Sequence, residues 1–200
     1  MEYMDVSRYV ASKFVEYGLK PIFSDSLLQF FDVEYNDIKH ARLALLNDKG
    51  YEIKVFKLGD DFVCRGFTGA GNVKAEVVFC GYGIESEDYN DYRSINVREK
   101  IVMVFKTNPS WVGKSDWGDL SPRGKARIAK KQGAKAILFI NQPFELSQRI
   151  LAGSVACGPR PHLEDFPMLQ ISNMLVDTLI KNLYQPISEI HKVINEKKAP

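Results

Sequence analysis

The sequence predicts an α+β domain with a β-rich first half, an α/β second half and one shared core. In the first half, residues 41–58 form two apolar runs around Asn47-Asp48-Lys49-Gly50, a typical hairpin signal. In the second half, apolar runs at 101–105 and 136–140 flank a helical pattern, which predicts a parallel strand–helix–strand crossover. Nothing between the halves resembles a linker, and 200 residues are enough to bury one substantial core.

The chain begins with a predicted helix over residues 5–17. Apolar side chains from Val6 to Tyr17 recur at helical spacing, Gly18 stands where a C-terminal cap belongs, and Pro21 follows. The helix has one apolar stripe, so it needs a surface to pack on.

Three further strands are expected before residue 106. Residues 27–35 and 74–80 are the first two, and residues 101–105 are the third. Glycines between residues 66 and 71 precede the second of these strands, where a hairpin or bulge is the best account.

The second half alternates helices and strands. Residues 107–121 are predicted to be a loop that holds both tryptophans, and the fully apolar strand 136–140 is of the kind buried on both faces. The remaining expected elements are a helix over 122–133, a loop over 141–165, a strand over 166–172, a helix starting at Ser172 or Asn173 and ending at 183, and a helix over 186–195.

Composition excludes several classes of protein. The 27 basic and 25 acidic side chains give a net charge of +2, so there is no clustered basic excess of the kind that binds nucleic acid. The apolar runs are too short to span a bilayer, and residues 1–21 lack the pattern of a signal peptide. We therefore expect no nucleic-acid partner and no membrane span.

The three cysteines, Cys64, Cys80 and Cys157, are isolated from one another. No C-x-x-C pair exists, which argues against a thiolate metal site and against a disulfide framework. Small buried core residues are the favoured interpretation, and a single bridge with one free thiol is the alternative.

Candidate catalytic centres are scarce. Of the three histidines, His162 lies beside acids in the segment "HLED", where a solvated surface is favoured over a metal site; His40 and His191 are also expected at the surface. No G-x-S-x-G elbow is present. The glycines of "GFTGAGNVKAEV" lead into a strand rather than a helix, so they do not form a phosphate loop. The five cations of "PRGKARIAKK" suggest a solvated helix face, with anion binding as the alternative.

One segment combines aromatic and acidic residues densely enough to suggest a site. It is the joint between two strands, "VVFCGYGIESEDYNDYRSINVREKIVMVF", from residue 77 to residue 105. Without a nucleophile, a metal set or an oxyanion donor beside it, this loop is better explained as a joint, fixed by Asp91 accepting backbone N–H bonds and by Tyr92 filling space. The candidate peptide- or protein-contact residues are Tyr82, Glu85, Tyr89, Asp91, Tyr92, Trp111 and Trp117.

The same segment resembles the protease-associated (PA) domain found inside zinc aminopeptidases of the di-zinc exopeptidase family. The pattern V-F-x-G-Y-G-I is followed by a D-Y doublet, matched by Asp91-Tyr92, and by D-V-x-G-K-I-V-x-V. Asn96 and Glu99 stand where that last motif has Asp and Gly. "RGKARIAKKQGAKAILFIN" and "FPMLQISNMLVDTLI" resemble the family's next helix–strand and its closing strand and helix.

The resemblance implies a swivelling β/β/α arrangement, with two β layers, flanking helices and the one parallel crossover. Residues 1–21 resemble the first helix of the split catalytic domain, which leaves residues 22–200 as the PA domain. In such enzymes the zinc ligands follow the insertion and begin with an H-x-D segment, which this chain lacks. No catalytic or metal residue is therefore assigned here, and no cofactor is expected in this chain, with zinc in the parent enzyme.

The implied function is that of a non-catalytic accessory domain in a secreted, hydrolytic metallopeptidase. We expect the chain alone to be inactive, with the parent's catalytic domain and a peptide or protein substrate as its partners. The parent is expected to be secreted, periplasmic or cell-surface, with a signal upstream. Two alternatives stay open: a peptide- or protein-binding PA module of a non-enzymatic, receptor-like protein, and a small hydrolase built on the tyrosine–carboxylate loop.

Overall fold

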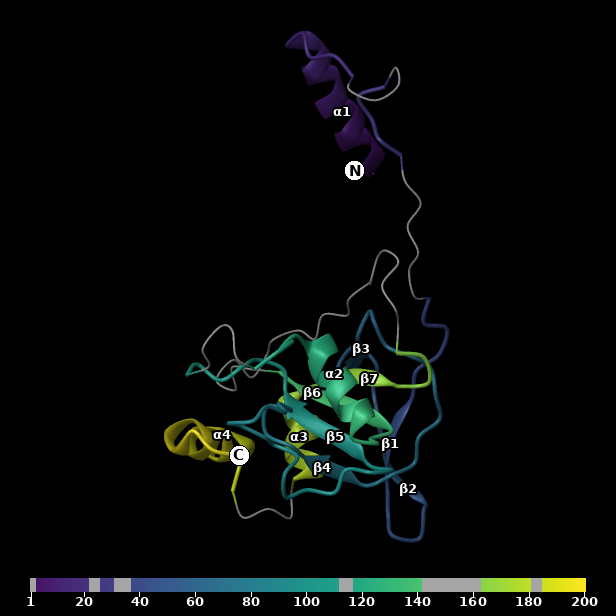
Figure 1. The fold of residues 1–200 in the computed structure, drawn as a ribbon. Coiled ribbons are helices and arrows are strands. Elements are labelled where there is room, and N and C mark those ends of the chain that lie inside the picture. Colours follow the sequence, from purple (N-terminus) through teal and green to yellow (C-terminus); the bar gives the residue numbers. More distant parts are fainter. Residues whose placement is uncertain (1–2, 22–25, 31–36, 112–116, 142–162, 181–184) are drawn as a thin grey trace. The chain divides into compact units, whose positions relative to one another are not determined.

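The computed structural model describes residues 3–21, 26–30, 37–111, 117–141, 163–180 and 185–200 (Figure 1). The chain divides into two compact units, Met1–Glu34 and Tyr35–Pro200. The first unit contains helix α1 (Tyr3–Glu16), which matches the helix expected over 5–17. Its end is closed as expected by Gly18, which has a φ of 75° and donates its N–H to the Val15 carbonyl.

The second unit is built on a five-stranded sheet with the order β3-β7-β6-β5-β4. Strands β4 (Val77–Phe79), β5 (Ile101–Phe105), β6 (Ala136–Ile140) and β7 (Met168–Ile171) are parallel, and β3 (Phe62–Cys64) pairs antiparallel with β7 at the edge. A separate hairpin joins β1 (Leu43–Leu46) to β2 (Glu52–Phe56). Two sheets with flanking helices confirm the predicted mixed α and β fold.

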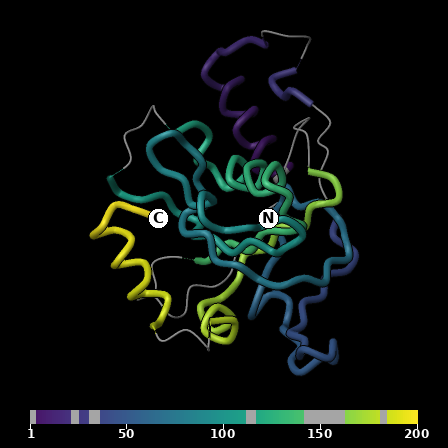
Figure 2. The backbone as a smooth tube through the Cα atoms, turned by 60° about the horizontal axis from the view of Figure 1, so that its bottom comes forward, coloured from purple at the N-terminus to yellow at the C-terminus, as the bar shows by residue number. Residues whose placement is uncertain are grey.

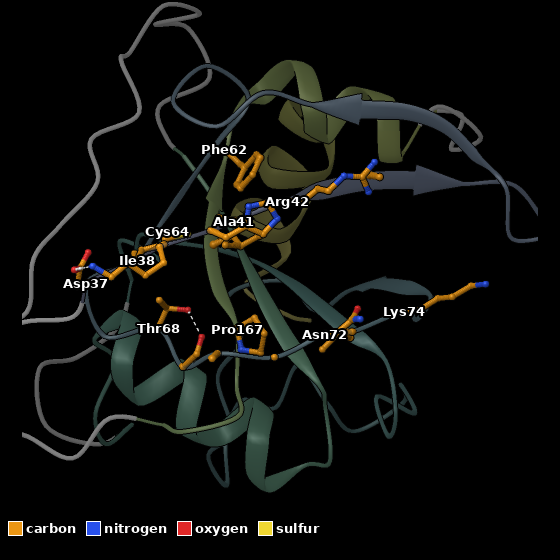
Figure 3. Close-up of a pocket in the computed structure, with 18 of the residues that line it drawn as sticks. Asp37, Ile38, Ala41, Arg42, Phe62, Cys64, Thr68, Asn72, Lys74 and Pro167 are labelled. Atoms are coloured by element: carbon orange, nitrogen blue, oxygen red, sulfur yellow. Dashed lines mark hydrogen bonds and ion pairs between the residues drawn. The ribbon is translucent and has the colours of Figure 1, made fainter.

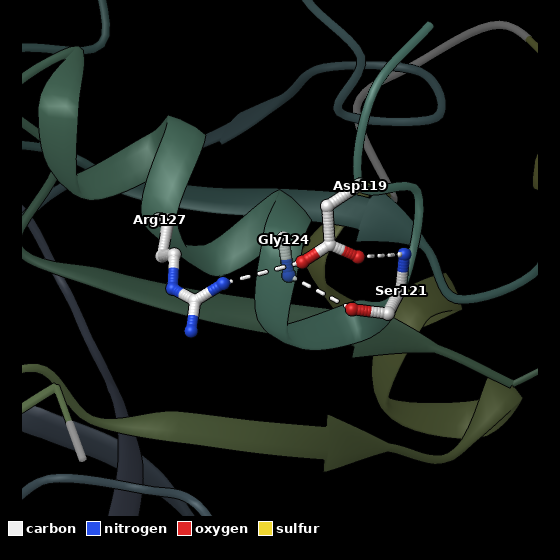
Figure 4. A network of polar contacts seen from close by, with 4 residues as sticks. All are labelled: Asp119, Ser121, Gly124 and Arg127. Carbon is white, nitrogen blue, oxygen red and sulfur yellow. Dashed lines mark hydrogen bonds and ion pairs between the residues drawn. The ribbon is translucent and has the colours of Figure 1, made fainter. Parts of the chain in front are cut away.

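Helix α2 (Pro122–Lys131) connects the parallel strands β5 and β6, which confirms the expected crossover. Its start is fixed by Ser121, whose Oγ accepts the Gly124 N–H at 3.1 Å, and by Asp119, which accepts the Ser121 N–H and pairs with Arg127 (Figure 4). Gly133, with a φ of 89°, ends the helical region as the sequence predicted.

Side-chain alternation along the strands divides the core into two layers, one on each face of the sheet. Helix α2 covers one face of the sheet, and α3 lies on the other (Figures 1 and 2). On one face, Val104 and Phe139 pack with Ala126 and Ala129 of α2. On the other face, the strands pack against helices α3 (Asn173–Leu179) and α4 (Ile187–Lys197) and against the hairpin. The side chains of this second layer include Phe105, Leu138, Ile140, Leu175, Val176, Ile187 and Ile194.

Several expectations need correction. Residues 27–30, the described part of the strand expected over 27–35, form no strand, and the rest of that range lies outside the described residues. Strand β3 was not predicted, because it has three residues and owes its existence to pairing with β7. The glycine-rich segment before β4 forms neither a hairpin nor a bulge: it has a turn at residues 66–67, where the Thr68 N–H donates to the Arg65 carbonyl, and it does lead into a strand as expected.

Candidate functional site

The joint between β4 and β5 turns on two glycines whose backbone no other residue adopts easily. Gly81 has a φ of 46° and Gly83 a φ of 69°. A Cβ at Gly81 would overlap the Asp91 carboxylate, and one at Gly83 would lie 2.8 Å from Cγ1 of Val104. Both glycines are therefore required by conformation and by close packing.

Asp91 holds this joint together from the inside. Its side chain is 4% exposed, and Oδ2 accepts the backbone N–H of Ile84 at 2.9 Å, which confirms the expected role of the carboxylate. Burial raises the pKa of Asp91 to about 6, an effect that the Ile84 N–H and Lys125 partly oppose. A structural bond to the loop backbone accounts for Oδ2, whereas Oδ1 is buried without a hydrogen-bond partner among the described residues.

The aromatic residues of the joint form a packed cluster rather than an open lining. Tyr82 and Tyr89 are 1% and 2% exposed. Tyr89 stacks on Trp117 with ring centroids 4.9 Å apart, and Trp111 meets the Tyr82 ring edge-on at 5.9 Å. Burial raises the pKa of both tyrosines, so their phenols stay protonated at neutral pH.

Lys125 is the residue in this region that the sequence did not reveal. It belongs to α2, where all five cations were expected on a solvated face, yet it is fully buried. Its Nζ donates to the carbonyls of Phe105 at 2.9 Å and Thr107 at 2.8 Å, just beyond the end of β5. Burial lowers the pKa of Lys125 to about 7, and Asp91 opposes that shift. The available signal was spacing, since Lys125 shares a helix face with Ala129 at i+4.

Helix α4 also reaches this cluster, through His191 and Asn195. The Tyr82 hydroxyl lies 3.0 Å from Nε2 of His191 and donates to Oδ1 of Asn195 at 2.9 Å. The His191 ring also meets Phe105 edge-on, with centroids 4.9 Å apart. His191 is thus half-buried rather than at the surface as expected, and burial lowers its pKa.

The candidate contact residues divide into two groups. Tyr82, Tyr89, Asp91 and Tyr92 are buried in the joint, so their side chains serve packing in this state. Glu85, Trp111 and Trp117 keep partial exposure; Glu85 accepts a bond from Gln132 at 2.8 Å and pairs with Lys131 at the end of α2. Contact between any of these residues and a peptide stays a prediction.

The cysteines and histidines add no reactive centre in the described residues. Cys64 and Cys80 are buried free thiols, and burial raises the pKa of Cys80 to about 12, which keeps it an unreactive thiol. Cys157 and His162 lie outside the described residues. Within the described ranges, no group of three His, Cys, Asp or Glu side chains could hold a metal ion. No helix there is long and apolar enough to cross a membrane.

A second feature is a pocket of about 950 Å³ beside β3 (Figure 3). Ile38, Ala41 and Arg42 lie along one side, and Thr68, Asn72 and Lys74 lie along the other. Apolar side chains of Phe62, Cys64, Pro167 and Leu169 also line it. Sequence reasoning did not find this pocket, because its walls come from segments of the chain that only the fold brings together.

Comparison with known proteins bears on the family and on the fold. A family model described as "PA domain" matches residues 73–179. Among solved structures, an aminopeptidase from Aneurinibacillus sp. strain AM-1 is similar to this chain with a TM-score of 0.52 at 19% identity. The likeness covers 90% of this chain and 35% of that one, and at this identity it shows a shared fold. No curated protein matches the chain.

Proposed function

The chain belongs to the PA domain family, and from this premise we propose that it is a non-catalytic accessory domain of a secreted zinc aminopeptidase. In this role the domain shapes the access of peptide substrates to a separate catalytic domain, or binds peptide or protein itself. The observation that supports the proposal is the match of the family model over 73–179, more than half of the chain. The fold shared with an aminopeptidase, of which this chain spans 35% of the length, agrees with it.

The chemistry of the joint supports an accessory rather than a catalytic role. Asp91 is the buried carboxylate and Lys125 the buried amine of the candidate site, and each is already bonded to backbone. A general acid or base must reach the proton that it transfers, within about 3 Å or through one water. Both groups are instead directed at loop backbone that they hold in place.

Zinc in this proposal belongs to the catalytic domain of the parent, where it would activate water for peptide hydrolysis. No residue of this chain is assigned as a ligand. Export of the parent from the cytoplasm is part of the same proposal and follows from the family resemblance.

The coding sequence that follows residue 200 tests the proposal directly. We expect an open reading frame with an H-x-D segment, followed by a Glu-Glu pair and a further His as zinc ligands. A continuing frame without these ligands would contradict the aminopeptidase assignment and would favour a receptor-like parent.

The accessory role has its own test in the parent enzyme. Deleting residues 35–200 should change kcat/KM for long peptides by about tenfold or more. An aminoacyl-anilide should be hydrolysed at a similar rate with and without these residues, because only long substrates extend beyond the catalytic centre. Equal effects on both substrates would contradict a role in access.

A further inference from the structure

Two arginines from distant parts of the sequence meet at one aromatic ring. Arg65 follows β3, and Arg123 lies in the first turn of α2. Cζ of Arg65 lies 5.6 Å from the ring centroid of Phe67, and Cζ of Arg123 lies 5.1 Å from the same centroid. All three residues are half-buried, so each of them also reaches the surface. The fold therefore brings two cations to one partly exposed place on the domain.

The Arg65 guanidinium is held in place but is not neutralised. One of its terminal nitrogens, Nη1, donates at 2.9 Å to Oε1 of Gln170, which is 3% exposed. Its Nε is buried and has no hydrogen-bond partner in the described part of the chain, and burial lowers the pKa of Arg65. A neutral amide orients the guanidinium without compensating its charge, so an anionic acceptor is what this group lacks.

Arg123 also lacks a carboxylate of its own, since no ion pair joins it to an acid within the described ranges. Asp119 attracts it only at longer range, an attraction that helps to lower the pKa of Asp119. The Asp119 carboxylate itself accepts the Ser121 N–H and pairs with Arg127 at 3.3 Å. The cation of Arg123 is therefore left for another anion.

Such an arrangement differs from ordinary surface charge. Several exposed lysines of the domain pair with acids, as Lys135 does with Glu99 at 3.0 Å. Arg65 and Arg123 have less contact with water, which makes an uncompensated charge more costly for them. Two like charges around one ring also repel each other, and an anion bound to both would remove that repulsion.

We propose that Arg65 and Arg123 form a binding site for an oxyanion, a carboxylate or a phosphate, with Phe67 as its apolar wall. Each guanidinium can offer two parallel N–H donors to such a group, and contact with the Phe67 ring helps to fix both planar groups. Carboxylates and phosphates share the chemistry that this pair recognises. The site goes beyond the proposed function and does not depend on it.

Titration of the whole chain with inorganic phosphate and, separately, with acetate tests the site at neutral pH and constant ionic strength. The readout is the Nε–H signal of each arginine in two-dimensional NMR spectra. We expect the signals of Arg65 and Arg123 to move together and to saturate with a single dissociation constant, while the signal of Arg98 does not follow. Tighter binding of phosphate would assign the site to a phosphorylated ligand, and tighter binding of acetate would assign it to a carboxylate.

Three variants and the tighter of the two ions sharpen the test. Arg65→Gln and Arg123→Gln should each weaken binding by about tenfold, as expected for the loss of a hydrogen bond between charged groups. Arg65→Lys keeps the charge but loses the planar fork, so it should recover only part of that affinity.

Arg98→Gln is the matched control. This exposed arginine lies beside Gly133, at the other end of α2 from Arg123. Its loss should change the affinity by less than about twofold, because only a weak, screened attraction is removed. The same spectra show whether each variant is folded.

Two results would overturn the inference. One is that the signals of Arg65 and Arg123 move no more than that of Arg98, a result from the wild-type chain that does not depend on whether a variant folds. The other is an unchanged affinity in both glutamine variants. Either result leaves the proposed function standing, because that function is decided by the zinc-ligand residues encoded after residue 200. Conversely, an absence of those ligands would refute the aminopeptidase assignment without affecting an anion site at Arg65 and Arg123.

Discussion

At the scale of single residues, the joint between β4 and β5 depends on side chains that bond to backbone. Asp91 holds the Ile84 N–H, and Lys125 holds the carbonyls of Phe105 and Thr107. Gly83 allows Val104 to pack directly against the turn. The most recognisable motif of the sequence is therefore a structural one, and substitutions in it should act first on stability.

Gly83→Ala should lower the free energy of unfolding by roughly 2–4 kcal/mol, because alanine is strained in the left-handed backbone at this position and its Cβ would overlap Val104. Gly59→Ala is the matched control: Gly59 has a φ of 92° but nothing within 4 Å of an added Cβ, so only the conformational cost of about 1 kcal/mol remains. Urea unfolding of both variants measures the difference. Equal losses would show that packing at Gly83 contributes nothing.

Lys125 should make stability depend on pH. Its folded-state pKa of about 7 lies below the ordinary value of 10.5, so the unfolded chain holds more protons between these two values and stability rises with pH there. Conversely, the stability that this group contributes is lost as pH falls from 10.5 through 7. The slope should approach about 1 kcal/mol per pH unit.

Urea unfolding of the wild type and of Lys125→Met between pH 7 and 10 measures this slope. The variant keeps the length of the side chain but cannot titrate, so the slope should be smaller. Parallel pH profiles for the two proteins would contradict the buried, neutralised state of the amine.

At the scale of elements, local pattern predicted the strands and helices that have strong local signals. The hairpin follows from its turn residues, β6 from a fully apolar run, and α2 from its helical pattern and final glycine. Strand β3 was missed because its pairing partner, β7, lies far away in the sequence. The burial of Lys125 and His191 was missed for the same reason: what covers them comes from distant segments.

Helix α4 offers a test of such a distant contact. Tyr82→Phe removes the hydroxyl that bonds to Asn195 and lies 3.0 Å from His191, so α4 should open more easily, with amide exchange faster by about tenfold. Exchange in α2, which packs on the other face of the sheet, should be unchanged. Uniformly faster exchange in both helices would mean that the bond stabilises the whole domain rather than the docking of α4.

Glu99, which has a left-handed backbone just before β5, allows a test of one position of the family pattern. Glu99 has a φ of 62° at the position where that pattern has glycine. Glu99→Gly should therefore raise the free energy of unfolding by about 1 kcal/mol, although it removes an exposed ion pair with Lys135. A shift of the urea midpoint measures the gain, and a lower midpoint would show that the ion pair outweighs the relief of strain.

At the scale of the whole molecule, the family could be predicted from one motif, whereas the pocket could not. The motif is contiguous in sequence and describes a backbone turn with its supporting residues. The pocket is assembled from residues within 37–46, 62–74 and 167–169 and from Glu52, and none of these segments alone indicates a pocket. The family match over residues 73–179 shows the PA domain, and the similarity to a solved aminopeptidase shows the shared fold.

The central claim is that this chain performs no peptide hydrolysis itself. The measurement that tests it is the release of p-nitroaniline from leucine p-nitroanilide by the purified chain, with and without added zinc. The claim predicts a rate equal to that of buffer in both conditions. Zinc-dependent release that follows the concentration of the chain would contradict the claim.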